Sequence, residues 1–274
     1  VFETSLGISI GRISLLITVN FGVQMLVDLL SAKWINVIGT RRAIVAAHAF
    51  AAAGLVALGV LPYRTADPYV GVLCAVCLCA VGGGITEVLI SPIVEACPSE
   101  HKAKTMSLLH SFYCWGSAGV VVVSTLFLAL FGSGSWRVLA LLWALLPIVN
   151  GLFFLKTPLA PLVADGEKGM TAGELFRSKM FWVVILMMVC AGASEQAVSQ
   201  WASTFAEKGL GVSKALGDLA GPTVFSLLMG LSRLIYGKRG DQMDLTKTML
   251  ACCGLCAAAY LLIGLTQSPL AGLA

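Results

Sequence analysis

Long apolar stretches alternate with short polar connections along the whole chain. Eight of them have about the 20 residues that an α-helix needs to cross the hydrocarbon core of a membrane. These stretches are Ile8–Leu30, Ala43–Leu61, Tyr69–Val94, Met106–Phe131, Val138–Leu155, Phe181–Phe205, Leu219–Tyr236 and Met249–Leu265. Because backbone groups in lipid must be satisfied within the segment, the pattern predicts an all-α, polytopic membrane protein with eight transmembrane helices.

The composition supports a membrane protein and argues against a soluble one. Hydrophobic residues make up 58% of the chain and charged residues only 12%, whereas soluble domains carry about 25% charged residues. The net charge of +4 is small, and no basic patch with interleaved aromatics predicts a nucleic-acid partner. The lipid bilayer is therefore the expected partner.

Nine cysteines are present, most of them inside the apolar stretches. Cysteine in such a setting behaves as a small hydrophobic residue, so we expect neither a metal site nor a disulfide framework.

The chain begins at Val1 without a signal-peptide pattern and ends at Ala274, just after an apolar stretch. We therefore expect it to be a fragment of a larger protein.

Lysine and arginine are concentrated in alternate connections, which predicts the orientation of the helices. By the positive-inside rule these connections lie in the cytoplasm, as in a multi-pass protein of the plasma (cytoplasmic) membrane. The basic residues concerned are Lys33, Arg41, Arg42, Lys102, Lys104, Lys156, Lys168, Arg177, Lys179, Lys238, Arg239 and Lys247.

One long connection, residues 156–179, is rich in proline, glycine and charge. It predicts three parts: an N-terminal half bundle over 1–155, a cytoplasmic linker over 156–179, and the start of a C-terminal half bundle over 180–274. Within the linker, the sequence TAGELF is either a short amphipathic helix or a solvated loop. Weak internal symmetry between the two halves is typical of secondary transporters.

Glu87 is the most informative polar residue, because it lies inside an apolar stretch. A charge at mid-bilayer costs about 3 kcal/mol on insertion scales, and a low dielectric disfavours the charged form of a carboxyl group. Glu87 is therefore predicted to couple proton movement to transport. The alternative is a protonated side chain that hydrogen-bonds to a neighbouring helix and has only a structural role.

A second polar group lies in the sixth stretch, where Glu195, Gln196, Gln200 and Trp201 are predicted to bind solute. Residues three and four apart share a helix face, so the polar side chains form a stripe that continues to Ser203. Amides hydrogen-bond hydroxyl groups, and the tryptophan ring offers a face for a sugar. A polar contact between helices is the alternative for the stripe, and anchoring at the membrane interface is the alternative for Trp201.

The first stretch carries Asn20, Gln24 and Asp28 at successive spacings of four residues. Asn20 and Gln24 are predicted to line the solute cavity. Asp28 lies nearer the cytoplasm and is assigned to a gate, together with Arg233, which occupies the corresponding place in the other half, and Asp241.

Two histidines, His48 and His110, lie near predicted cytoplasmic helix ends. We expect them to contact solvent, with a proton relay as the alternative for His110.

The connection after the first stretch resembles a loop motif of the major facilitator superfamily, G-x-x-x-D-[RK]-x-G-[RK]-[RK]. Gly39 and Arg41 match it, whereas Ala32 and Asn36 replace its first glycine and its aspartate. A second copy, Gly237-KRG-Asp241, keeps both. The resemblance implies that the eight stretches are helices two to nine of twelve.

Three further segments resemble the proton-coupled fucose permeases of that superfamily. They are Gly83–Pro92, which carries Glu87 and a proline five residues later, Leu108–Gly116, and Gly192–Trp201. The resemblance implies that Glu87 acts in proton coupling and sugar binding.

Taken together, these patterns predict a secondary transporter that moves a small polar solute, in particular a sugar, by proton symport. No phosphate-binding loop is present, so the expected energy source is a proton gradient, without a cofactor. The alternatives are a proton-driven drug or metabolite exporter of the same fold, a non-transporting membrane sensor, and an intramembrane enzyme, for which no catalytic set stands out. The pattern leaves the solute, the direction of transport and the oligomeric state open.

Overall fold

The computed structural model describes residues 2–162 and 172–265, and these ranges are helical without a strand. The long helices are α2 (Ile10–Ile38), α3 (Thr40–Val60), α4 (Pro68–Ala96), α5 (Lys102–Phe131), α6 (Trp136–Lys156), α8 (Lys179–Leu210), α10 (Val224–Arg239) and α11 (Leu245–Leu265). Shorter elements are α1 (Phe2–Leu6), η1 (Leu61–Tyr63), η2 (Ser133–Ser135), α7 (Ala172–Arg177), α9 (Lys214–Asp218), η3 (Leu219–Thr223) and η4 (Gly240–Gln242). Within these ranges, eight spans are long and apolar enough to cross a membrane, which confirms the predicted all-α membrane fold.

Local sequence signals fix the ends of the helices. Asp67 caps α4, because its carboxylate accepts a hydrogen bond of 2.9 Å from the backbone N–H of Tyr69. The helix α2 runs eight residues beyond the predicted Leu30 and stops only before Gly39, whose φ of 88° favours glycine. The helix α7 confirms the short helix that was one of two alternatives for the linker.

The seventh span is not a continuous α-helix, although its apolar pattern predicts one. It consists of α9, the π-helical turn η3 and α10. Pro222 lies in the turn, where it has no N–H to donate and its ring crowds the carbonyl of Asp218, four residues earlier. Thr223 compensates, because its Oγ1 donates a hydrogen bond of 3.1 Å to that carbonyl.

The contacts divide the chain into two compact units. Unit 1 comprises Val1–Glu100 and Leu126–Val163, and unit 2 comprises His101–Thr125 and Ala164–Ala274. The helix α5 contributes to both units. The predicted division into 1–155, 156–179 and 180–274 stays a prediction.

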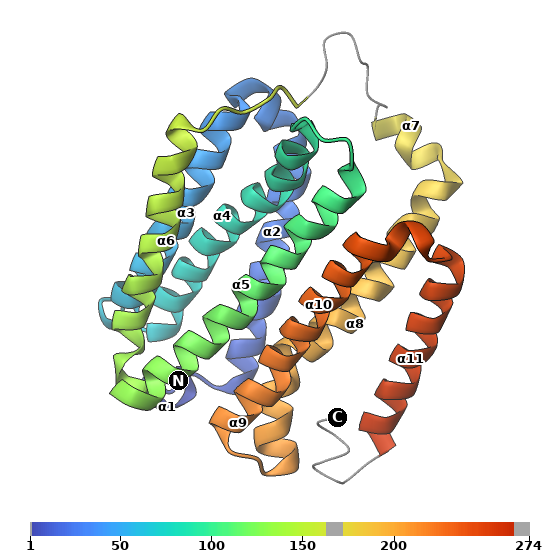
Figure 1. The fold of residues 1–274 in the computed structure, drawn as a ribbon. Coiled ribbons are helices and arrows are strands. Elements are labelled where there is room, and N and C mark those ends of the chain that lie inside the picture. The colour runs from blue at the N-terminus through green and yellow to red at the C-terminus, as the bar shows by residue number, and fades with distance from the viewer. Residues whose placement is uncertain (1, 163–171, 266–274) are drawn as a thin grey trace. The chain divides into compact units, whose positions relative to one another are not determined.

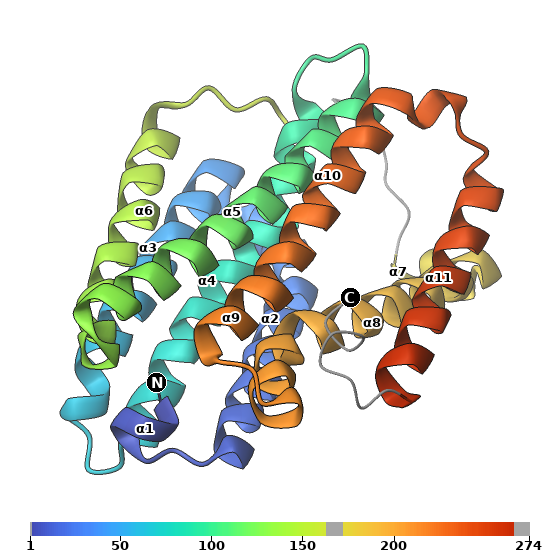
Figure 2. The same ribbon diagram turned by 60° about the horizontal axis from the view of Figure 1, so that its bottom comes forward.

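Within unit 1, α3 packs against α4 and α6, and α2 packs against α4 (Figure 1). Within unit 2, α8 packs against α9 and η3 (Figure 2). The apolar core of unit 1 forms two clusters. One is centred on the buried residues Ala43, Ile44, Leu89 and Ile93, and the other on Ile8, Leu16 and Val72.

Glycine brings α3 and α4 into backbone contact between these clusters. A Cβ atom placed on Gly82 would lie 2.6 Å from the carbonyl oxygen of Ala47 and 2.7 Å from the backbone nitrogen of Ala51. On the opposite helix, a Cβ atom on Gly54 would lie 2.7 Å from the backbone nitrogen of Cys79. Neither position has room for a side chain, and such small residues are what membrane helices use to pack closely.

Replacing Gly82 by alanine is expected to lower the melting temperature of the purified protein in detergent. The added methyl group would overlap the backbone of α3, and overpacking of this kind typically costs about 1–3 kcal/mol. Gly22→Ala in α2 is the matched control, because a Cβ atom there meets nothing within 4 Å. Equal melting temperatures of the two variants would contradict the backbone contact.

Candidate functional site

Two further glycines of α4 bring polar side chains of α2 against the α4 backbone. The amide nitrogen Nε2 of Gln24 lies 3.0 Å from the position that a Cβ atom would take on Gly83. The carboxylate oxygen Oδ1 of Asp28 lies 3.3 Å from the corresponding position on Gly84. Any larger residue at either glycine would have to displace these side chains.

Glu87 lies on the same face of α4, three residues after Gly84 and four after Gly83. Long side chains in a helix point back toward its N-terminus and cover the preceding turn. Glu87 therefore extends toward the turn of α4 that Gln24 and Asp28 contact. The side chain of Glu87 is exposed at the surface of unit 1.

Neither carboxyl group has a counter-ion within the described part of unit 1. The Oδ1 atom of Asp28 is buried and has no hydrogen-bond partner. Asn20 lies two turns before Asp28 on α2 and is half-buried. The structure thus places Gln24 and Asp28 against Gly83 and Gly84, with Glu87 on the next turn of α4 and Asn20 one turn from Gln24 on α2.

The predicted polar stripe in unit 2 is present in part on α8. Gln200 donates a hydrogen bond of 3.3 Å from its Nε2 to the Oε1 of Gln196, so the two amides share one face. Glu195 and Gln196 are half-buried, Gln200 is exposed, and Trp201 is 38% exposed. These four residues occupy adjacent turns of one helix, as their spacing predicts.

Ser203 departs from this stripe. Its hydroxyl donates to the Oδ1 of Asp218 and accepts a hydrogen bond of 3.0 Å from the Nζ of Lys214. Lys214 also pairs with Asp218 at 2.9 Å. The serine therefore ties α8 to α9 and is not placed as a solute contact. The prediction that the stripe continues to Ser203 misses this network, because lysine and aspartate lie beyond the apolar pattern of α8.

Arg233 lies on α10 of unit 2, near the N-terminal part of α5. Its carbonyl oxygen accepts a hydrogen bond of 2.6 Å from the hydroxyl of Ser107, and its guanidinium lies within electrostatic range of His110. Asp28 belongs to unit 1, so the expected pairing of Asp28 with Arg233 stays a prediction. The side chain of Asp241 lies outside the described residues.

His48 does not contact solvent as predicted. It is only 8% exposed, because the α3–α6 contact covers it. Its Nδ1 and the carbonyl oxygen of Ile44 are 2.7 Å apart, and Nε2 and the Nδ2 of Asn150 are 2.8 Å apart. Since an amide NH2 only donates, we assign the ring proton to Nδ1. Asn150 is a polar residue inside the apolar stretch of α6, and this position was the sequence signal that could have identified it as the partner of His48.

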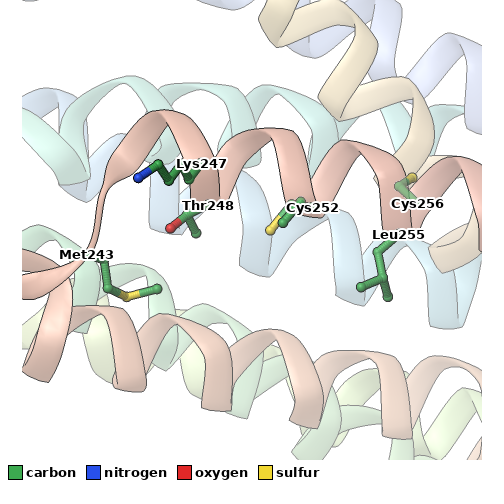
Figure 3. Close-up of a pocket in the computed structure, with 7 residues that line it drawn as sticks. Met243, Lys247, Thr248, Cys252, Leu255 and Cys256 are labelled. Carbon is green, nitrogen blue, oxygen red and sulfur yellow. The ribbon is translucent and has the colours of Figure 1, made fainter.

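An open pocket lies along α11 (Figure 3), and none of the predicted solute-binding residues of α8 lines it. Met243 faces the helix, which supplies the other lining residues, namely Lys247, Thr248, Ala251, Cys252, Leu255 and Cys256. The lining is almost entirely apolar. It offers little to a polar solute and is not part of the candidate site.

Comparison with known families identifies the class of protein. A family profile described as Major Facilitator Superfamily matches residues 1–274. The chain belongs to this superfamily of membrane transporters, in agreement with the eight membrane-length helices among its described residues. No curated protein and no solved structure gives a significant match.

The α2–α4 contact can be tested by a disulfide between Val27→Cys and Gly84→Cys. The Cβ atom of Val27 lies 3.1 Å from the position of a Cβ atom on Gly84, and disulfides join Cβ atoms about 3.8 Å apart. In a background without the nine native cysteines, mild oxidation should join the two helices. Cleavage at a protease site in the α3–α4 loop would then leave one band on a non-reducing gel.

The matched control for this experiment is Val27→Cys with Gly83→Cys. A Cβ atom on Gly83 meets only the side chain of Gln24 within 4 Å, so this pair should cross-link poorly. Equal cross-linking of both pairs would contradict the register of the two helices.

Proposed function

We propose that this protein is a secondary active transporter that moves a small polar solute, a sugar, by proton symport with alternating access. The observation that carries the proposal is the place of Glu87. Glu87 lies in a membrane-spanning helix, its side chain is exposed at the surface of unit 1, and it follows by one turn the glycines that Gln24 and Asp28 contact.

The cost of a charge in lipid restricts what the face around Glu87 contacts. A charged side chain at the bilayer centre costs about 3 kcal/mol on insertion scales, and such residues face a bundle interior or an aqueous cavity. We therefore assign this face to a water-accessible path. A carboxyl group on such a path binds a proton when the surroundings are dry and releases it when they hydrate.

The proposed solute class follows from the polar residues on α8. Gln196 and Gln200 present amide groups that donate and accept hydrogen bonds, and Trp201, the next residue along α8, presents a partly exposed ring. Hydroxyl groups and the apolar face of a sugar ring match this set. The resemblance of residues 83–92, 108–116 and 192–201 to fucose permeases supports the same class.

The first test is sugar-driven proton movement in proteoliposomes containing the full-length protein. Adding L-fucose, galactose or glucose outside should alkalinise the external medium, and Glu87→Gln should abolish the signal because an amide cannot carry the proton. Glu100→Gln, a change of the same kind at an exposed residue after α4, should behave like wild type.

The absence of a proton signal with every sugar, from protein that is folded and inserted, would overturn sugar symport. Proton-driven efflux of large apolar compounds under the same conditions would then identify an exporter of the same fold.

A second test concerns the amides of α8. Gln200→Ala removes one hydrogen-bonding group from the proposed solute contact, and such a bond contributes about 1 kcal/mol. The half-saturating sugar concentration in the transport assay should therefore rise about fivefold. Gln242→Ala, at an exposed amide in η4, serves as the control, and an equal response of both variants would contradict solute binding at α8.

A further inference from the structure

Asp28 contacts the backbone of α4 one turn before Glu87, and we infer that the two carboxyl groups hold one proton between them. Asp28 is then the second member of the proton-binding site and not only part of a gate. This inference rests on the proposed function in that the shared proton is the one that drives transport. It is carried by the geometry of the contact and by the absence of any other compensation among the described residues.

The two carboxyl groups lie at matching depth. Only α3 separates α2 from α4 along the chain, so these two spans run in the same direction across the membrane. Asp28 lies ten residues before the end of α2 at Ile38, and Glu87 lies nine before the end of α4 at Ala96. At 1.5 Å per residue these distances are about 15 Å and 14 Å.

The absence of a side chain at Gly84 leaves room for the carboxyl group of Asp28 beside α4. Asp28 contacts the Cβ position of Gly84 through its Oδ1 atom, and Glu87 lies one turn further along the same face of α4. A side chain at position 84 would separate them. The glycine therefore allows a carboxyl group of α2 to approach a carboxyl group of α4.

The surroundings of the Asp28 carboxyl group favour a shared proton over two ionised carboxylates. Its buried Oδ1 atom has no hydrogen-bond partner, which is costly for an ionised carboxylate. Two neighbouring carboxylates in a low dielectric are not both readily ionised. One proton on the pair removes half of the charge, and a protonated carboxyl group can donate the hydrogen bond that an ionised neighbour lacks.

No other described side chain of the packed helices compensates the pair. On α3, the Nη1 of Arg41 donates to the carbonyl oxygens of Phe154 and Leu155, and His48 is bonded to Ile44 and Asn150. On α2, Arg12 pairs with Asp67 at 3.2 Å. The remaining ionisable residues of the three helices are Arg42 on α3, Tyr69, Cys74, Cys77, Cys79 and Glu95 on α4, and Lys33 on α2, whose side chain lies outside the described part.

The test is infrared difference spectroscopy of the full-length protein in lipid, without any solute, as the pH is varied. The C=O stretch of protonated carboxyl groups reports how many protons the pair holds. A shared proton predicts one such band near neutral pH in wild type. In Asp28→Asn and in Glu87→Gln, the remaining carboxyl group loses its neighbour, so the midpoint of the band should fall by about one pH unit or more.

Two further variants keep the test decisive if either of these does not fold. Gly84→Ala retains both carboxyl groups but places a methyl group 3.3 Å from the Asp28 Oδ1 atom, and it should lower the midpoint in part. Asp28→Glu should retain the neutral-pH band. Asp67→Asn, which removes a carboxylate paired with Arg12 at 3.2 Å, is the control and should leave the band unchanged.

An unchanged midpoint in Asp28→Asn or Gly84→Ala would overturn the shared proton and leave Glu87 to act alone, as would the absence of any neutral-pH band in wild type. This outcome is separate from the proposed function, because the spectra require no transport. If the neutral-pH band is present but no sugar drives proton movement, the shared proton stands and sugar symport is overturned. If sugar drives proton movement but the band is absent, sugar symport stands and the shared proton is overturned.

Discussion

The close approach of α4 to its neighbours is the constraint on which unit 1 depends. Membrane helices gain little from hydrophobic burial against each other, because lipid is equally apolar, and close packing of small residues takes over. Three consecutive glycines of α4 allow two helices to pack closely against it. Gly82 contacts the backbone of α3, whereas Gly83 and Gly84 contact side chains of α2. One short run of sequence therefore sets both the packing of the unit and the place of its polar groups.

The same constraint explains why the candidate site lies where it does. The apolar clusters around Leu89 and around Val72 pack the two ends of unit 1, and the glycines lie between them along α4. Without side chains at Gly83 and Gly84, room remains for Gln24 and Asp28 at a depth where apolar packing would otherwise be expected. The apolar clusters thereby stabilise the positions of Gln24 and Asp28, whose own side chains add little to the apolar packing.

The sequence predicted the fold well and the site only in part, for a physical reason. Span length and hydrophobicity are local properties, so eight helices follow directly from the apolar pattern, and a carboxyl group such as Glu87 stands out within it. Contacts between helices depend on rotation and register, which spacing along one helix does not determine. The spacing grouped Asn20, Gln24 and Asp28 on one face but did not identify α4 as their partner, and it gave His48 no partner at all.

The contrast among three carboxyl groups within the spans argues for function at the α2–α4 contact. Asp218 is compensated as a structural carboxylate should be, because Lys214 pairs with it at 2.9 Å and Ser203 donates to it. Asp28 and Glu87 have no such partners among the described residues of their unit. A protonated glutamate that holds two helices together would need an acceptor on the neighbouring helix, and Asp28 on α2, whose Oδ1 atom lies 3.3 Å from the Cβ position of Gly84, is available for that role. The structural alternative for Glu87 therefore also leads to a proton bound between two carboxyl groups, which is the property that a proton-coupled transporter requires.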